Sequence, residues 1–148
     1  MAAQSDIEHL IRGYFKIWVA RDRDAMERAV ADDFHFTSPL DNRLDRQTFF
    51  TRCWPGGDAI AAIDIQRLLP QNDECAFVTY EITIKDGRRF RNTEFITTRD
   101  GKLRDVEVYF GWNIPHDATR LLWRQTEIDG RSRQPTHEGE AEGREEDA

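Results

Sequence analysis

The sequence has little cysteine and no long apolar run. Cys53 and Cys75 are its two cysteines, and they lack the CxxC spacing of a metal or redox motif. Two thiols are too few for a disulfide scaffold, so we expect both to be reduced, in a cytoplasmic protein. Residues 1–15 place acidic side chains before their apolar ones and contain no continuous apolar stretch. This pattern predicts neither a signal peptide nor a membrane span.

A clustered basic surface is also missing. The formal net charge is −7, and most of it comes from residues 137–148, which hold six acids and one arginine. The rest of the chain is therefore nearly neutral. Because nucleic acids and anionic membranes are bound by grouped lysines and arginines, we expect neither as a partner.

The familiar motifs for metals and organic cofactors do not occur in the sequence. Its four histidines lie at positions 9, 35, 116 and 137, with no HxH or HExxH spacing and no Cys/His cluster. There is no glycine-rich phosphate loop and no nucleophile elbow. We therefore expect no metal and no cofactor.

Aromatic side chains are plentiful, and helical patterns come first along the chain. Aromatics make up 11% of the 148 residues, which is enough to build the core of one folded domain. Ser5 and Glu8 form a capping-box pattern ahead of apolar residues at helical spacing, which predicts a helix over 5–22. Two further helices are expected over 24–34 and over 45–54, the last ended by the PGG sequence at 55–57.

The second half of the chain reads as strands separated by tight turns. Alternating or apolar strand patterns occupy residues 34–39, 62–70, 74–84, 88–98 and 102–110. The turn dipeptides between the last four are Asn72-Asp73, Asp86-Gly87 and Asp100-Gly101. Three helices and a meandering antiparallel sheet predict an α+β domain. We expect it to occupy residues 1–115, with residues 116–148 forming a polar, acidic and partly or wholly disordered C-terminal extension.

The order of elements resembles the NTF2-like superfamily, and within it the SnoaL-like polyketide cyclases and steroid Δ-isomerases. The resemblance rests on the spaced residues Y…W…D…A…ADDF.F.SP early in the chain and DGKL…VYFG late, and it covers about residues 5–115. It implies a cone in which three N-terminal helices pack inside a curved antiparallel sheet around an apolar pocket. It also implies a homodimer formed through the outer face of the sheet.

The same resemblance implies which residues do chemistry. Residues 11–39 resemble the corresponding isomerase segment without a gap, which places Tyr14 on the tyrosine of the oxyanion hole. Ser38 then stands where the isomerases have their proton-shuttling aspartate. Counting back from the late Arg-Asp-Gly turn puts Glu94 on the neutral carboxylic acid of the oxyanion hole. Tyr14 and Glu94 are thus the catalytic candidates, and the usual shuttle is absent.

Strand alternation leaves two positions open for Glu94. In the first, Glu94 faces the pocket with Phe90, Asn92 and Ile96, and desolvation raises its pKa. In the second, a turn longer by one residue brings Thr93 inward, and Glu94 pairs with an arginine on the outer face.

Further residues are expected to line the pocket, although any of the aromatic ones would also suit an ordinary core. They are Trp18, Phe34, Phe36, Phe50, Trp54, Tyr80, Asn92, Val106, Val108 and Phe110. Asp41, in the loop after Pro39, is a candidate for a displaced base at the pocket mouth, but loop aspartates are mostly turn formers.

Two functions fit these expectations. The first is a cofactor-independent isomerase, cyclase or dehydratase, in which Tyr14 and Glu94 polarise an oxygen of a small, apolar, cyclic substrate. The second is a non-catalytic ligand-binding or dimeric scaffold module, which the serine at position 38 fits naturally.

Overall fold

The computed structural model describes residues 5–117. The chain divides into a compact unit, Met1–His116, and a second segment, Asp117–Ala148. Nearly all of the predicted acidic extension therefore lies outside the described residues. The elements follow in the order α1 (Asp6–Ala20), α2 (Arg23–Ala29), β1 (Val30–Ser38), β2 (Asp41–Asp45), α3 (Arg46–Thr48), η1 (Phe49–Cys53), η2 (Trp54–Ala59), β3 (Ile60–Pro70), β4 (Cys75–Ile84), β5 (Arg89–Arg99) and β6 (Lys102–Ile114). Within residues 5–117 no helix is both long and apolar enough to cross a membrane.

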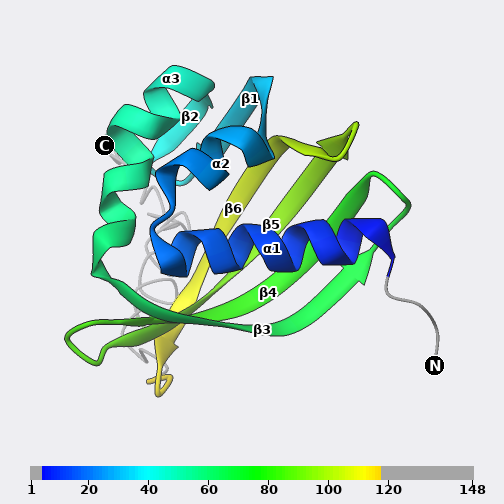
Figure 1. Ribbon diagram of the computed structural model, residues 1–148. Coiled ribbons are helices and arrows are strands. Elements are labelled where there is room, and N and C mark those ends of the chain that lie inside the picture. The colour runs from blue at the N-terminus through cyan, green and yellow to red at the C-terminus, as the bar shows by residue number, and fades with distance from the viewer. Residues whose placement is uncertain (1–4, 118–148) are drawn as a thin grey trace, which may run out of the picture. The chain divides into compact units, whose positions relative to one another are not determined.

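The six strands form one curved sheet in the order β2-β1-β6-β5-β4-β3. Strands β3 to β6 make the expected antiparallel meander, but β1 pairs with β6 in parallel, so the predicted antiparallel sheet also contains one parallel pair. This pairing joins distant parts of the chain and has no turn that a sequence could signal. Register shifts in the β3–β4 and β5–β6 pairs mark irregularities that favour bending. Figure 1 shows the sheet curving around α1.

Helix α1 forms because a side-chain cap starts it just before its apolar, buried face begins. The Ser5 side chain accepts a hydrogen bond from the Glu8 N–H, as the capping pattern predicts. The helix ends where Arg21 takes a left-handed conformation and its N–H bonds to the Trp18 carbonyl. Its buried face consists of Ile7, Ile11, Tyr14, Phe15 and Trp18. Aromatic rings from this face therefore reach into the curve of the sheet.

Helix α2 is shorter than predicted. It ends at Ala29, and Val30 to Phe34, which the sequence suggested as helix, belong to β1. The reason is tertiary: Val30 is paired with Leu103 of β6, and both side chains are buried. Packing against the sheet outweighs the local helical pattern of this segment.

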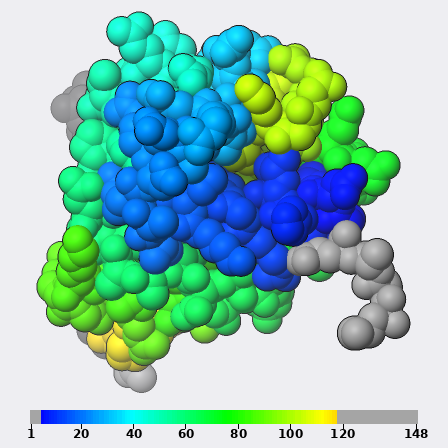
Figure 2. All heavy atoms as spheres, in the orientation of Figure 1, coloured from blue at the N-terminus to red at the C-terminus, as the bar shows by residue number. Residues whose placement is uncertain are grey.

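The third helical segment begins as predicted but is irregular and longer. Asp45 caps it by accepting from the Thr48 N–H. One α-helical turn then passes into the π-helical η1 and the 3₁₀-helical η2, which continues to Ala59 through the PGG sequence expected to end it. Pro55 is tolerated because it stands at the start of η2, where no helical N–H is needed. Figure 2 shows this segment packed beside α1 and α2.

Gly57 of η2 has no room for a side chain. A Cβ there would lie 2.6 Å from the Trp18 ring and would also overlap the Arg21 guanidinium. We expect Gly57→Ala to lower the free energy of unfolding by about 1–3 kcal/mol, as overpacking usually does, measured by urea denaturation. Gly56→Ala is the matched control, because a Cβ at Gly56 meets nothing within 4 Å. Equal losses in the two variants would contradict this account.

Candidate functional site

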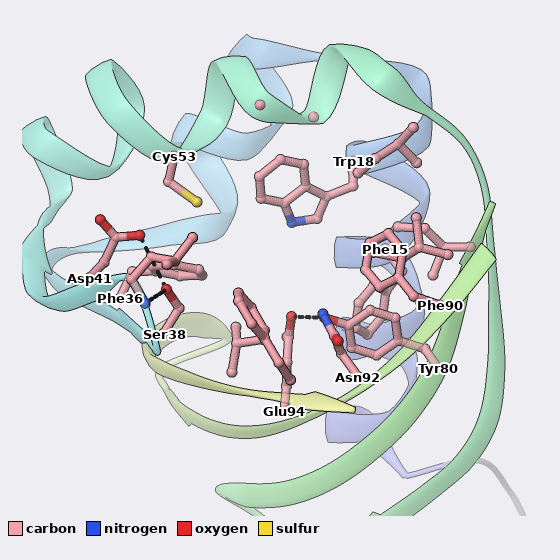
Figure 3. A pocket seen from close by; sticks show the side chains of 18 of the residues that line it. Phe15, Trp18, Phe36, Ser38, Asp41, Cys53, Tyr80, Phe90, Asn92 and Glu94 are labelled. Atoms are coloured by element: carbon pink, nitrogen blue, oxygen red, sulfur yellow. Dashed lines mark hydrogen bonds between the residues drawn. The ribbon is translucent and has the colours of Figure 1, made fainter. Parts of the chain in front are cut away.

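A cavity of about 410 Å³ lies between α1, the segment from β2 to η2, and the inner face of the sheet (Figure 3). Its surface is mostly aromatic and aliphatic. The apolar and glycine lining consists of Phe15, Trp18, Phe36, Leu40, Gly56, Gly57, Ile60, Ile63, Ile82, Ile84, Phe90, Val108 and Phe110. The polar lining consists of Ser38, Asp41, Arg52, Cys53, Tyr80, Asn92 and Glu94. A cavity of this composition suits a small apolar molecule with a few polar groups.

Strand β5 turns Glu94 into the cavity. Asn92, Glu94, Ile96 and Thr98 are buried in alternation, and the Glu94 residue is only 4% exposed. Thr93 points to the outer face, where its hydroxyl lies 2.9 Å from that of Thr79. The register that would bring Thr93 inward is therefore wrong.

The outer-face arginines pair with a different acid. Arg89 and Arg91 lie 3.0 and 3.3 Å from the carboxylate of Glu81, which points away from the cavity on β4. Glu94 consequently has no cationic partner on that face.

The Glu94 carboxyl is held by Tyr80. The Tyr80 hydroxyl donates to Glu94 Oε1 over 2.6 Å, from the neighbouring strand β4, where Tyr80 pairs with Asn92. Burial raises the pKa of Glu94 from 4.5 to about 7, and the hydrogen bond from Tyr80 opposes part of this rise. Burial, followed by the charge of Glu94, likewise raises the pKa of Tyr80. Near neutral pH the cavity thus contains a carboxyl group that is protonated in a large fraction of molecules.

Tyr14 is not on the cavity wall, contrary to the role implied by the family resemblance. Its hydroxyl and Glu94 Oε2 are both buried without a hydrogen-bond partner among the described residues. The two groups are neighbours, because the charge of Glu94 is the second cause, after burial, that raises the pKa of Tyr14. Tyr80, rather than Tyr14, is therefore the tyrosine bonded to the acid, and Tyr14 lies behind it in the core.

A second polar group lies on the side of the cavity away from Tyr80 (Figure 3). The Ser38 hydroxyl is 3.2 Å from Asp41 Oδ2, and Arg52 Nη2 is 3.1 Å from Asp41 Oδ1. Cys53 borders the same space, and burial, with smaller contributions from the charges of Asp41 and Glu94, raises the pKa of its thiol to about 12. This thiol is therefore not a nucleophile at neutral pH. Among residues 5–117 no group of three or more potential ligands is placed to hold a metal ion.

The structure brings together part of the predicted site. Besides Glu94, six of the predicted residues line the cavity: Trp18, Phe36, Tyr80, Asn92, Val108 and Phe110. Of the residues expected to line the cavity from β5 and β6, Phe90, Asn92, Glu94, Val108 and Phe110 do so, whereas Ile96 and Val106 lie in the core.

Four other predicted residues lie in the core and not on the cavity wall. Phe34 and Val106 are fully buried, and the Phe34 ring packs on Phe49. Trp54 lies behind Trp18, with ring centroids 4.8 Å apart, and Phe50 packs in turn against Trp54. Sequence periodicity shows that these side chains are buried, but it cannot show whether a buried side chain reaches the cavity or packs elsewhere in the core.

Several lining residues were missing from the predicted set. Phe15 could have been found, because it lies three positions before Trp18 on the same face of α1. Arg52 and Cys53 could not, because the π-helical turn of η1 sets their direction. Asp41, considered from the sequence as a displaced base at the pocket mouth, does line the cavity, but its hydrogen bond with Ser38 was not predicted.

Comparison with solved structures identifies the class of protein. An NTF2-like protein of unknown function from Burkholderia xenovorans LB400 matches with a TM-score of 0.64 at 20% identity, over 82% of this chain and 91% of that chain. A protein from Kribbella flavida DSM 17836, provisionally named a ketosteroid isomerase, matches with a TM-score of 0.60 at 20% identity, over 72% and 78%. One from Sinorhizobium meliloti, provisionally named a polyketide cyclase, gives 0.59 at 17% identity, over 72% and 100%. At such identities the likeness shows the fold, and this chain has the NTF2-like fold.

The sequence pattern of the SnoaL-like domain matches residues 11–106, which is more than half of the chain. The protein therefore belongs to the SnoaL-like family, as the early and late motifs indicated. No curated protein matches the chain. Family membership leaves the activity and the ligand open.

Glu94 should make stability depend on pH. Below about pH 4.5 its carboxyl is protonated in both the folded and the unfolded chain, whereas above pH 7 it is ionised in both, and ionisation inside the cavity opposes folding. We expect the free energy of unfolding of the wild type to fall relative to Glu94→Gln by roughly 3 kcal/mol across this range, for a pKa shift of this size. The measurement is urea denaturation from below pH 4.5 to above pH 7.

Glu74→Gln is the control, because it removes an exposed carboxylate from the β3–β4 turn. A wild-type stability that runs parallel to that of Glu94→Gln over the whole range would show that Glu94 is not held in an apolar environment.

Proposed function

We propose that the protein binds a small, apolar, cyclic molecule that carries a carbonyl-type oxygen, and that it acts on this molecule as a cofactor-independent isomerase, cyclase or dehydratase. The observation that carries the proposal is the Tyr80–Glu94 hydrogen bond of 2.6 Å inside an otherwise apolar cavity. Folding this carboxyl into the interior costs stability, so a ligand that uses it provides a physical reason for its presence.

The protonated carboxyl group supplies a hydrogen-bond donor to the ligand oxygen. When a neighbouring C–H bond loses its proton, negative charge develops on that oxygen, and a donor inside a cavity with few competing waters stabilises it more than it stabilises the neutral carbonyl. Tyr80 polarises the carboxyl group from the other side by donating to Oε1. Asn92, beside Tyr80 on the wall, offers an additional polar contact.

A non-catalytic binding module is the alternative. Ser38 occupies the place of the family's proton shuttle, and a cavity without a base would still bind a ligand through Glu94. The two functions share the binding step and differ in turnover, so binding is tested first.

Binding is tested with 9-fluorenone, whose oxygen only accepts hydrogen bonds, against fluorene, which has the same rings without the oxygen. Below pH 7 we expect wild-type protein to bind fluorenone with a dissociation constant about tenfold lower than that for fluorene, because one good hydrogen bond contributes about this factor. The preference should disappear above pH 7, because the ionised carboxylate of Glu94 has no proton to donate. Fluorescence titration across this pH range measures both dissociation constants.

Two variants separate the contributions. Glu94→Gln keeps an N–H donor and should retain the preference at every pH, whereas Glu94→Met has a similar volume and no donor and should abolish it. Equal affinity of the wild type for the two ligands below pH 7, or no binding of either, would refute the proposed function.

We also propose that two copies pair through the outer face of the sheet. Leu69, Phe77 and Phe95 are paired residues on β3, β4 and β5 and form an apolar row on that face. Leu69 is 62% exposed and Phe77 45%, and the Phe77 and Phe95 rings pack at 4.7 Å. Contiguous exposed apolar residues of this kind favour association.

The homodimer is tested by light scattering after size-exclusion chromatography. We expect the wild type to have the mass of two chains, and Phe77→Lys to shift it toward one chain by placing a charge in the apolar row. Val19→Lys, at a 38% exposed position on α1, is the control and should remain dimeric. A monomeric wild type at micromolar concentration would contradict the proposal.

A further inference from the structure

The group formed by Ser38, Asp41 and Arg52 has no part in holding the ligand oxygen at Glu94. We propose, resting on the function proposed above, that Asp41 is the base of this cavity and removes a proton from the carbon next to the ligand's carbonyl group. The proposal rests on how Asp41 is held, on the backbone that presents it, and on its position relative to Glu94.

Each oxygen of Asp41 has a polar partner, one through a hydrogen bond and one through an ion pair. Ser38 Oγ lies 3.2 Å from Oδ2, and the Leu40 N–H donates to the same Ser38 oxygen over 3.1 Å. With its lone pair engaged by Leu40, the serine hydroxyl directs its own proton to the aspartate. The guanidinium of Arg52 lies 3.1 Å from Oδ1 and places a positive charge beside the carboxyl group. The Asp41 side chain is 16% exposed, so it borders the cavity without lying in open solvent.

The backbone around this group is irregular on both sides. The β1–β2 pairing shifts register between Phe36 and Ser38 and sets Asp41 directly opposite Ser38. The π-helical turn Phe49–Cys53 supplies Arg52. Strand irregularities and π-helical turns are over-represented at functional sites because they redirect individual side chains. Here both redirect polar groups into the same wall of one cavity.

Asp41 and Glu94 line different walls of the same cavity, so one bound ligand would lie between them. Both line the cavity. After burial, the charges of Asp41 and Glu94 are the further causes that raise the pKa of the Cys53 thiol, so both acids lie near this thiol. In Figure 3, Asp41 and Ser38 lie on one side of the space and Tyr80 and Asn92 on the other. A flat molecule with its oxygen at Glu94 therefore presents its ring carbons toward Asp41.

The proton transfer balances without an outside reagent. The Asp41 carboxylate takes the proton from the carbon next to the carbonyl group, and the C–H electron pair becomes the C=C bond of an enol. The carbonyl π electrons move to oxygen, which takes the proton of Glu94. The enol oxygen then returns its proton to Glu94 as Asp41 gives a proton back to carbon. If Asp41 has first exchanged its proton with water, return to the same carbon incorporates solvent hydrogen, and return to a conjugated carbon gives a double-bond isomer.

The test is deuterium exchange of 2-tetralone, a bicyclic ketone with acidic protons beside its carbonyl group, followed by proton NMR in D₂O. We expect the wild type to accelerate exchange over buffer, and Asp41→Asn to lose about a hundredfold of this acceleration, within the usual contribution of a general base. Ser38→Ala, which removes one donor and keeps the carboxylate, should lose several-fold. Asp73→Asn, in the exposed β3–β4 turn, is the control for losing a charge and should exchange at the wild-type rate.

Fluorenone binding is measured for every variant and separates the two proposals. Unchanged binding with lost exchange in Asp41→Asn supports Asp41 as the base, and the Ser38→Ala result decides the matter if Asp41→Asn does not fold. Wild-type exchange rates in Asp41→Asn, or a wild type that binds fluorenone without accelerating exchange, overturn the assignment and leave the binding function intact. A wild type that does not bind fluorenone overturns the proposed function and this inference with it.

Discussion

The burial of the Glu94 carboxyl is the constraint on which the rest of the site depends. A carboxyl group among aromatic rings is tolerated only if it is protonated or accepts hydrogen bonds. Here Tyr80 donates a hydrogen bond to one of its two oxygens. The partial compensation explains why the pKa reaches only about 7. Any rearrangement that gave Glu94 an arginine, as the outer face does for Glu81, would fix it as a carboxylate and end its use as a donor.

The cavity stays open because aromatic rings are braced one layer behind it. Trp54 stacks behind Trp18, and the Arg21 guanidinium lies 4.1 Å from the Trp54 ring centroid while donating to the Trp54 carbonyl over 2.7 Å. Gly57 allows the Trp18 ring to approach the backbone of η2. These contacts hold the Trp18 ring, which lines the cavity, against Trp54 and the backbone of η2.

The sequence predicted features that repeat locally and missed those set by distant contacts. Strand alternation and the Asp100-Gly101 turn, where both residues have positive φ, were enough to bring Glu94 inward in one of two registers. The parallel β1–β6 pairing and the end of α2 depend on residues some seventy positions apart, so no local sequence pattern could predict them. The family resemblance implied Tyr14 as the partner of the acid and gave Tyr80 only a place on the pocket wall, whereas the β4–β5 pairing brings Tyr80 to Glu94.

The cavity contains two acids, Asp41 and Glu94, whose surroundings differ. Asp41 has a guanidinium and a hydroxyl as partners, whereas Glu94 has one tyrosine hydroxyl and apolar rings. Burial raises the pKa of Glu94 and favours its neutral form, whereas Asp41 lies beside a cationic guanidinium, and acid–base sites often contain two carboxyl groups in such different surroundings. Under the proposal made above, the Ser38 hydroxyl positions the base, Asp41, which lies three residues further along the chain.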